Sequence, residues 1–160
     1  AGAPPACDLA RERAVIDALL DAIAAGAVRS AHDCSDGGLA VPLAECAIMG
    51  RARPLGVHVD LRSWCNLPLR ALLFGEAQGR VIVVTADAAA VLDAAMRHAV
   101  PAPRIGHVRA KSDILRMRVA SRLIEAPLAS LIEAYHESIP KRMTRSASPV
   151  EVAFTAATPA

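Results

Sequence analysis

The sequence predicts an α+β fold in which a mixed β-sheet has helices layered on one face. The chain has 160 residues, the size of a single domain that can bury a core. Its apolar share is 54% and its aromatic share is 2%, so the core is expected to consist of Ala, Val, Leu and Ile. Periodic segments follow in the order helix, strand, helix, strand, strand, helix, strand, strand and helix. This order lacks the strict β-α alternation of a doubly wound parallel sheet.

The first two elements are a helix and a short strand. Asp8 is a suitable N-cap for a helix over residues 9–25, and Gly26 is suited to end it. The large apolar residues of this helix recur at helical spacing and predict its buried stripe: Val15, Ile16, Leu19, Leu20 and Ile23. A strand is expected over residues 28–32.

A second helix is expected over residues 39–49, ended by Gly50. Pro42 is tolerated only in the first turn, so the helix either starts near Leu39 or is kinked at the proline. Residues 55–61 alternate apolar and polar positions, which predicts a strand with one buried face.

The middle of the chain combines irregular segments with one apolar strand. Residues 62–70 show no period, and residues 72–80 form a second loop that contains glycines. Residues 80–85 are apolar on both faces, so they predict a central strand. Asp87 then caps a helix over residues 88–99.

The last third predicts strands over residues 104–108 and 113–119, which could form a hairpin, and a final helix that starts at Pro127 and ends before Pro140. The predicted division of the chain is a linker or cut end at 1–7, a domain at 8–140 and a disordered tail at 141–160.

Composition argues against several classes of function. A formal charge of +2 and few aromatic rings do not favour nucleic acid as a partner. The sequence contains neither an apolar run long enough for a membrane helix nor a signal peptide pattern, so we expect a cytoplasmic protein without a membrane partner. The four cysteines are widely spaced, which indicates reduced thiols.

The stretch from Ser30 to Ala40 holds the densest group of reactive side chains. Gly37 and Gly38 would let the backbone approach a phosphate, while Ser35 could donate its hydroxyl. Asp33 or Asp36 could hold Mg²⁺ against phosphate oxygens. The other interpretation is structural: Asp36 closes a turn and caps the following helix, and the glycines supply unusual backbone angles.

Two other chemistries fit this stretch poorly. A zinc site of His32, Cys34 and Cys46 lacks the paired ligand spacing of zinc proteins, which favours buried thiols. A Ser35, His32 and Asp33 triad is disfavoured because neighbouring side chains on a strand point to alternate faces.

Glu76 could face the same cleft as Asp36, or it could be a solvated carboxylate or one paired with Arg80. His58 and His107 lie on strand-like segments and are most simply surface or packing residues.

Two motifs resemble the phosphoribosylformylglycinamidine synthase family. Residues 30–41 read S-A-H-D-C-S-D-G-G-L-A-V and are similar to that family's S-A-H-D-x-S-D-G-G-L-A motif. Residues 73–81 read L-F-G-E-A-Q-G-R-V and are similar to its L-F-G-E-x-x-G-R-V segment. A V-D-L match at residues 59–61 and an I-G-x-V match at residues 105–108 extend the resemblance over residues 8–140. Pro42 and Cys34 depart from the family pattern.

The resemblance implies a C-terminal module like that of aminoimidazole ribonucleotide synthetase. The whole enzyme would use ATP, Mg²⁺ and glutamine-derived ammonia to convert formylglycinamide ribonucleotide to the amidine. Its main ligands would lie in upstream nucleotide-binding modules, and a glutaminase subunit or domain would supply ammonia. No catalytic residue is assigned to this chain. The residues expected at the nucleotide or phosphate cleft shared with the neighbouring module are His32, Asp33, Ser35, Asp36, Gly37, Gly38, Phe74, Gly75 and Glu76.

Two rival hypotheses remain. The module could be a non-catalytic structural or interaction part of that enzyme, with its loop serving only the fold. It could also belong to a sibling enzyme, an aminoimidazole ribonucleotide or selenophosphate synthetase.

Overall fold

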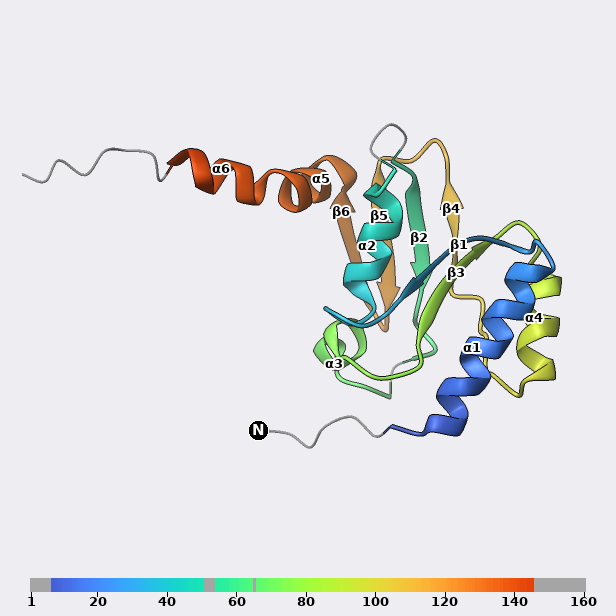
Figure 1. Ribbon diagram of the computed structural model, residues 1–160. Helices are drawn as coiled ribbons and strands as arrows, with labels where there is room; N and C mark the ends of the chain where they lie inside the picture. The colour runs from blue at the N-terminus through green and yellow to red at the C-terminus, as the bar shows by residue number, and fades with distance from the viewer. Residues whose placement is uncertain (1–6, 51–53, 65, 146–160) are drawn as a thin grey trace, which may run out of the picture.

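The computed structural model describes residues 7–50, 54–64 and 66–145, and it confirms the α+β fold (Figure 1). The elements along the chain are α1 (Leu9–Ala24), β1 (Val28–Asp33), α2 (Ala40–Ile48), β2 (Gly56–Asp60), α3 (Leu69–Phe74), β3 (Val81–Thr85), α4 (Ala88–Arg97), β4 (Gly106–Arg109), β5 (Ile114–Val119), β6 (Arg122–Pro127), α5 (Leu128–His136) and α6 (Ser138–Arg145).

The larger sheet has four strands in the order β4-β2-β5-β6. It is mixed, as expected, because β2 and β5 run parallel while the other two pairs are antiparallel. Val57 and Val59 of β2 and Leu115 and Met117 of β5 are buried on one face. Helix α2 lies over this face in Figure 1, and its Leu43 belongs to the same core. The core is aliphatic, in agreement with the composition.

The smaller sheet is a ribbon of β1 and β3, which pair antiparallel with His32 opposite Ile82. The prediction that residues 80–85 form a central strand is therefore wrong. Ile82 is buried in the main core and the other residues of β3 are partly buried. A continuous apolar run indicates that both faces of a strand are buried. Here helices and loops bury β3, so it needs no strand on its second edge.

Helix α1 differs from expectation in its buried face. Asp8 caps it as predicted, accepting hydrogen bonds from the N–H groups of Ala10 and Arg11. The fully buried residues of the helix, however, are Ala18 and Ala22, and the larger residues Ile16, Leu20 and Ile23 are exposed. Helices α1 and α4 lie side by side (Figure 1), and the buried residues of α4 are likewise alanines, Ala94 and Ala95.

Pro42 lies in the first turn of α2, which is one of the two placements expected, and its side chain is fully buried. The missing N–H costs little there because the first turn has no carbonyl partners for it.

Three expectations in the second half are wrong. Residues 69–74 form α3 rather than an irregular segment and a loop. Strand β6 is absent from the sequence prediction, although it pairs with β5 over six residue pairs. The segments at 106–109 and 114–119 do not form a hairpin, because β4 and β5 flank β2 on opposite sides.

The helical end of the chain extends further than expected. Helix α6 covers residues 141–145, for which the sequence predicts a disordered tail, and Pro140 occupies its first turn. Helix α5 packs against the core through Leu128, Leu131 and Ile132, and α6 extends away from the sheet in Figure 1. The rest of the expected tail, residues 146–160, and the expected linker at residues 1–6 lie outside the described residues.

Candidate functional site

The loop between β1 and α2 turns on two consecutive glycines in the left-handed region. Gly37 has φ 77° and Gly38 has φ 69°, values that residues other than glycine rarely adopt. The N-cap of α2 is Leu39, without a side-chain cap. The structural interpretation of Asp36 as the helix cap is therefore wrong.

The two sequence motifs contact each other directly. The Leu39 N–H donates to the Leu73 carbonyl at 2.9 Å, and the Gly37 N–H donates to Oε1 of Glu76 at 3.1 Å. A Cβ placed on Gly38 would lie 2.7 Å from the carbonyl carbon of Phe74. The backbone of the first loop thus lies against the backbone of the second, which only glycine permits.

This contact changes the predicted phosphate cradle. The N–H groups of Gly37 and Leu39 already bond to the second loop, so they are not free donors for an anion. The groups that face outward are the exposed side chains of Asp33, Ser35 and Asp36. The loop therefore presents carboxylates and a hydroxyl, not a nest of backbone N–H groups.

The two carboxylates of this loop differ in their surroundings. Hydrogen bonding from Ser35, and then from the backbone, holds the pKa of Asp33 below its usual value. Asp36 makes no hydrogen bond or ion pair to any residue that the structure describes. An exposed carboxylate with neither a cap nor an ion pair to form is available to another molecule.

A metal ion would find few protein ligands here. Within residues 7–50, 54–64 and 66–145, no three His, Cys, Asp or Glu side chains lie together as a metal cage would need. Mg²⁺ commonly binds through one or two carboxylates, with phosphates and waters completing its shell. Asp33 and Asp36 therefore fit a shared Mg²⁺–phosphate site better than a metal site formed by this chain alone.

His32 and Glu76 bond within the chain. Nε2 of His32 lies 3.1 Å from Oε2 of Glu45 on α2, and its Nδ1 donates to the Asp33 carbonyl at 2.8 Å. Both ring nitrogens are occupied, so His32 joins β1 to α2. Glu76 does not pair with Arg80. It accepts the Gly37 N–H beside Asp36, so Glu76 and Asp36 belong to neighbouring loops, as the expectation of a shared cleft requires.

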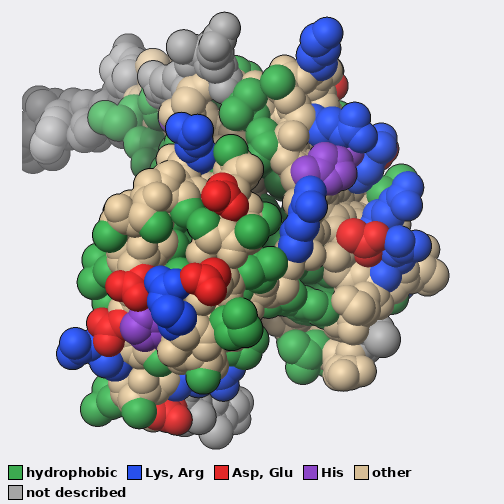
Figure 2. All heavy atoms as spheres, turned by 90° about the vertical axis from the view of Figure 1, so that its right-hand side faces the viewer, with side chains coloured by type: hydrophobic (Ala, Val, Ile, Leu, Met, Phe, Trp, Pro, Cys, Tyr) green, Lys and Arg blue, Asp and Glu red, His purple; other side chains and the backbone are tan. Residues whose placement is uncertain are grey.

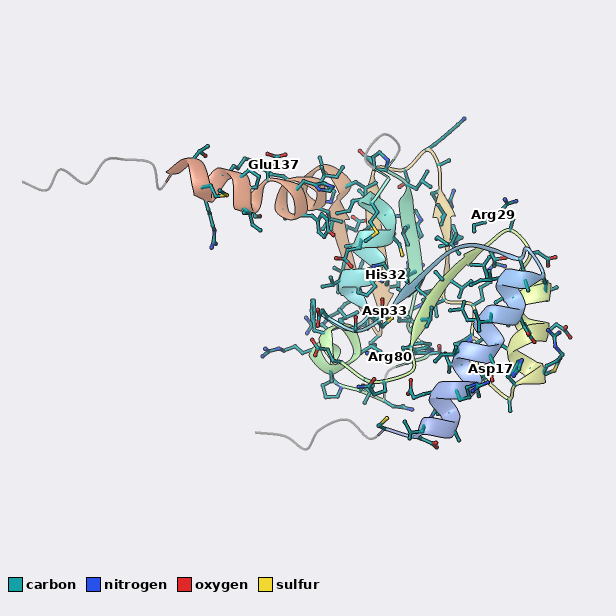
Figure 3. All side chains as sticks on the ribbon, viewed as in Figure 1. Asp17, Arg29, His32, Asp33, Arg80 and Glu137 are labelled. Atoms are coloured by element: carbon teal, nitrogen blue, oxygen red, sulfur yellow. The ribbon has the colours of Figure 1, made fainter. Side chains whose placement is uncertain are left out.

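Arg80 belongs to this region, although the sequence assigns it no role beyond a possible partner for Glu76. Its Nη2 donates to the Gly75 carbonyl at 2.5 Å, and its own carbonyl accepts the Cys34 N–H at 2.9 Å. Its Nε is buried and has no hydrogen-bond partner in the described chain. Figure 3 shows His32, Asp33 and Arg80 at the same end of the β1–β3 ribbon. The sequence did offer a signal, because Arg80 is the arginine of the second motif, L-F-G-E-A-Q-G-R-V.

Phe74 and Gly75 complete the second loop. Phe74 ends α3 and is 57% exposed, although it is a large apolar residue. Gly75 follows as the C-cap and donates its N–H to the Ala71 carbonyl at 3.0 Å.

The thiols behave as buried packing groups. Cys34 is 3% exposed and belongs to the core, and Cys46 packs against the same core. Burial raises the pKa of both thiols, which keeps them protonated and poor as metal ligands. Cys34 is thus a buried packing residue, as the structural interpretation expected, and Cys46 is a partly buried one.

Comparison with known proteins adds a family to this geometry. The model of the family "AIR synthase related protein, C-terminal domain" matches residues 2–117, which covers both motif loops. A curated relative, phosphoribosylformylglycinamidine synthase subunit PurL of Moorella thermoacetica, is 42% identical over 147 residues, which cover 91% of this chain and 19% of the relative.

Solved structures of PurL proteins also resemble this chain. PurL of Thermotoga maritima complexed with ADP superposes with a TM-score of 0.68 at 26% identity, over 79% of this chain and 22% of that one. PurLQS from the same organism gives a TM-score of 0.68 at 26% identity, over 78% and 22% of the two chains. The chain thus spans about a fifth of the length of the curated relatives it matches.

Proposed function

The chain belongs to the family of AIR synthase related C-terminal domains, and from this membership we propose that it is the C-terminal domain of a phosphoribosylformylglycinamidine synthase. Relatives at about 40% identity carry that name, which favours this enzyme over its sibling synthetases. The proposed whole enzyme converts formylglycinamide ribonucleotide, ATP and ammonia to the amidine in purine biosynthesis.

The observation that carries the domain's role is the contact between its two motif loops. Gly37 and Gly38 bring the first loop against Phe74 and Glu76, and the side chains of Asp33, Ser35 and Asp36 in that loop are exposed. We propose that the surface of this loop forms one side of a nucleotide cleft, whose other side is an upstream module of the same polypeptide. The ADP complex of Thermotoga PurL supports nucleotide binding in the whole enzyme.

Within that cleft the chain supplies positioning groups and no catalytic residue. Asp36, and more weakly Asp33, would help to hold Mg²⁺ beside the nucleotide phosphates. Bound Mg²⁺ would neutralise phosphate charge during transfer. The bonds that Gly37 and Leu39 make to the second loop hold in place the loop that carries these carboxylates.

The proposed partners follow from the same family. Upstream nucleotide-binding modules would cover the cleft, and a glutaminase subunit or domain would deliver ammonia. The PurLQS assembly of the Thermotoga relative supports association with other subunits. No helix in the described part of the chain has the length and apolar character to span a membrane. We propose a cytoplasmic location for the enzyme.

Replacing Asp36 by Asn in the full-length enzyme tests the role of the cleft. The substitution keeps the side chain's size and removes its charge, so we expect amidine formation to fall by roughly tenfold or more while the melting temperature is unchanged. Asp113→Asn is the matched control, because Asp113 lies before β5, away from both motif loops, and it should leave both unchanged. Full activity in Asp36→Asn, or a loss of stability alone, would favour the purely structural module.

A further inference from the structure

The face of the larger sheet that turns away from the core is unusually rich in cationic side chains. Along β2 and β5 the side chains alternate: Val59 and Met117 are buried on the core face, while His58, Arg116 and Arg118 project from the other. The edge strand β4 adds His107 and Arg109 to this open face.

Strand register brings these groups into one row. His58 lies opposite His107 on one side and opposite Arg116 on the other, and Arg116 lies opposite Glu125. The two imidazole rings are 5.5 Å apart between centroids. In the next row of the same face, Asp60 lies opposite Arg118.

The two carboxylates of this face are already paired. Asp60 bonds to Arg62 at 2.6 Å, and Glu125 bonds to Arg116 at 2.5 Å. Arg109 and Arg118 form no ion pair with a carboxylate of the described chain, and Arg109 donates instead to Nε2 of His107 at 3.2 Å. Neither arginine is held in an ion pair within the described residues, although Asp60 lies beside Arg118 and interacts with its charge.

These groups line a hollow rather than a flat surface. The hollow has a volume of about 280 Å³. Its charged and titratable lining residues are His58, His107, Arg109, Arg116, Arg118 and one carboxylate, Asp60. Figure 2 shows Lys or Arg side chains gathered around His on this side of the molecule. Burial, and then Arg116, Arg109 and His107, hold the pKa of His58 below its usual value, whereas Glu125 acts weakly in the opposite direction. The positive charges around His58 thus add to the effect of its burial.

We propose that this hollow binds the phosphate group of a small phosphorylated ligand. Guanidinium groups present paired N–H donors that match phosphate oxygens, and Arg109 and Arg118 have such donors to spare. The volume of the hollow is near the lower end of small-molecule sites, about 300 Å³, and the chain's formal charge of +2 gives no extended basic surface for nucleic acid. The site lies on the face of the sheet opposite α2, so it does not depend on the motif loops or on the proposed synthase activity.

Titration of the 160-residue chain with inorganic phosphate, followed by NMR of the histidine ring protons, tests the site. We expect saturable shifts of the His58 and His107 signals and a higher pKa for His58, because a bound anion stabilises the imidazolium form. ADP in a parallel titration separates the two sources: tighter binding than phosphate identifies an organic phosphate, and equal binding identifies the phosphate group alone.

Matched arginine variants make the test specific. Arg109→Gln with Arg118→Gln should weaken phosphate binding on the order of a hundredfold, and Arg118→Gln alone by about tenfold. The control combines Arg11→Gln with Arg29→Gln, which removes the same charge from exposed residues of α1 and β1; Arg29 lies at the opposite end of β1 from Asp33 (Figure 3). The proposal would be overturned if the chemical shifts did not saturate with phosphate, or if the affinity for phosphate fell equally in the control and in the double variant.

Discussion

Two glycines with almost the same backbone angle have very different surroundings. Gly26, after α1, has φ 70°, and a Cβ added to it would meet nothing within 4 Å. Gly38 has φ 69°, and a Cβ added there would meet the backbone of Phe74 at 2.7 Å. Both lie where a sequence reader expects a turn. The contact that requires glycine at position 38 is made with residues far along the chain. Local sequence could therefore predict a turn at Gly38 but could not show why no other residue fits there.

Alanine at these two positions separates backbone strain from steric overlap. Gly26→Ala should lower the free energy of unfolding by about 1–2 kcal/mol, the cost of a left-handed alanine. Gly38→Ala adds a clash with backbone atoms, so we expect a loss above about 3 kcal/mol. Urea unfolding of both variants measures the difference. Equal losses would show that the two loops are not held in contact.

At the scale of elements, the sequence predicted most of the helices and strands but did not predict which strands pair with one another. Alternation placed β2 and β5 correctly, but no local pattern shows that β2 separates β4 from β5. Strand β6 was missed because it leaves Leu123 exposed and so lacks a clear apolar face. In α1, the large apolar residues suggested the buried stripe, whereas alanines allow the close approach to α4.

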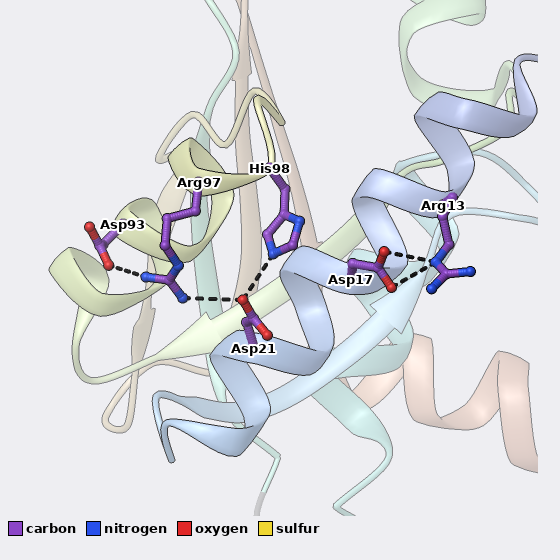
Figure 4. A network of polar contacts seen from close by, with 6 residues as sticks. All are labelled: Arg13, Asp17, Asp21, Asp93, Arg97 and His98. Carbon is purple, nitrogen blue, oxygen red and sulfur yellow. Dashed lines mark hydrogen bonds and ion pairs between the residues drawn. The ribbon is translucent and has the colours of Figure 1, made fainter.

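The α1–α4 pair is also joined by a polar network (Figure 4). Asp21 of α1 accepts from Nε2 of His98 at 2.9 Å and from Arg97 at 3.3 Å. These two bonds, with His98 first, hold the pKa of Asp21 below its usual value. Asp17, by contrast, pairs with Arg13 inside α1 itself, at 2.7 Å.

Asp21→Asn should therefore loosen the two helices in a pH-dependent way. A carboxyl whose folded pKa is lowered stabilises the protein above its unfolded pKa, about 4, and loses this effect as the pH falls through the folded pKa. We expect the variant to melt below the wild type at pH 6 and to differ less at pH 3. Hydrogen exchange at pH 6 should become faster in both α1 and α4.

Asp17→Asn is the control for this network, because its partner lies in the same helix. It should speed exchange in α1 alone. If Asp17→Asn and Asp21→Asn gave the same exchange pattern, the proposed link between the two helices would be contradicted.

At the scale of the whole molecule, one aliphatic core joins the larger sheet, α2, α3 and the β1–β3 ribbon. Both motif loops lie at the edge of this core. Leu39 follows the first loop and Leu73 precedes the second; both residues are buried, and a backbone hydrogen bond joins them. The sequence predicted which residues belong to the two motif loops. It could not predict that Glu76 takes the Gly37 N–H, or that Nε of Arg80 is buried beside them, since both depend on how the two loops pack.

The central claim is that this domain supplies the surface of a cleft and that the chemistry needs the rest of the enzyme. The direct measurement incubates the purified 160-residue chain, shown to be folded by a cooperative unfolding transition, with formylglycinamide ribonucleotide, ATP, Mg²⁺ and ammonia. We predict no amidine product and no substrate-dependent ATP hydrolysis, while the full-length enzyme assayed in parallel forms product. Amidine formation by the isolated chain would contradict the claim.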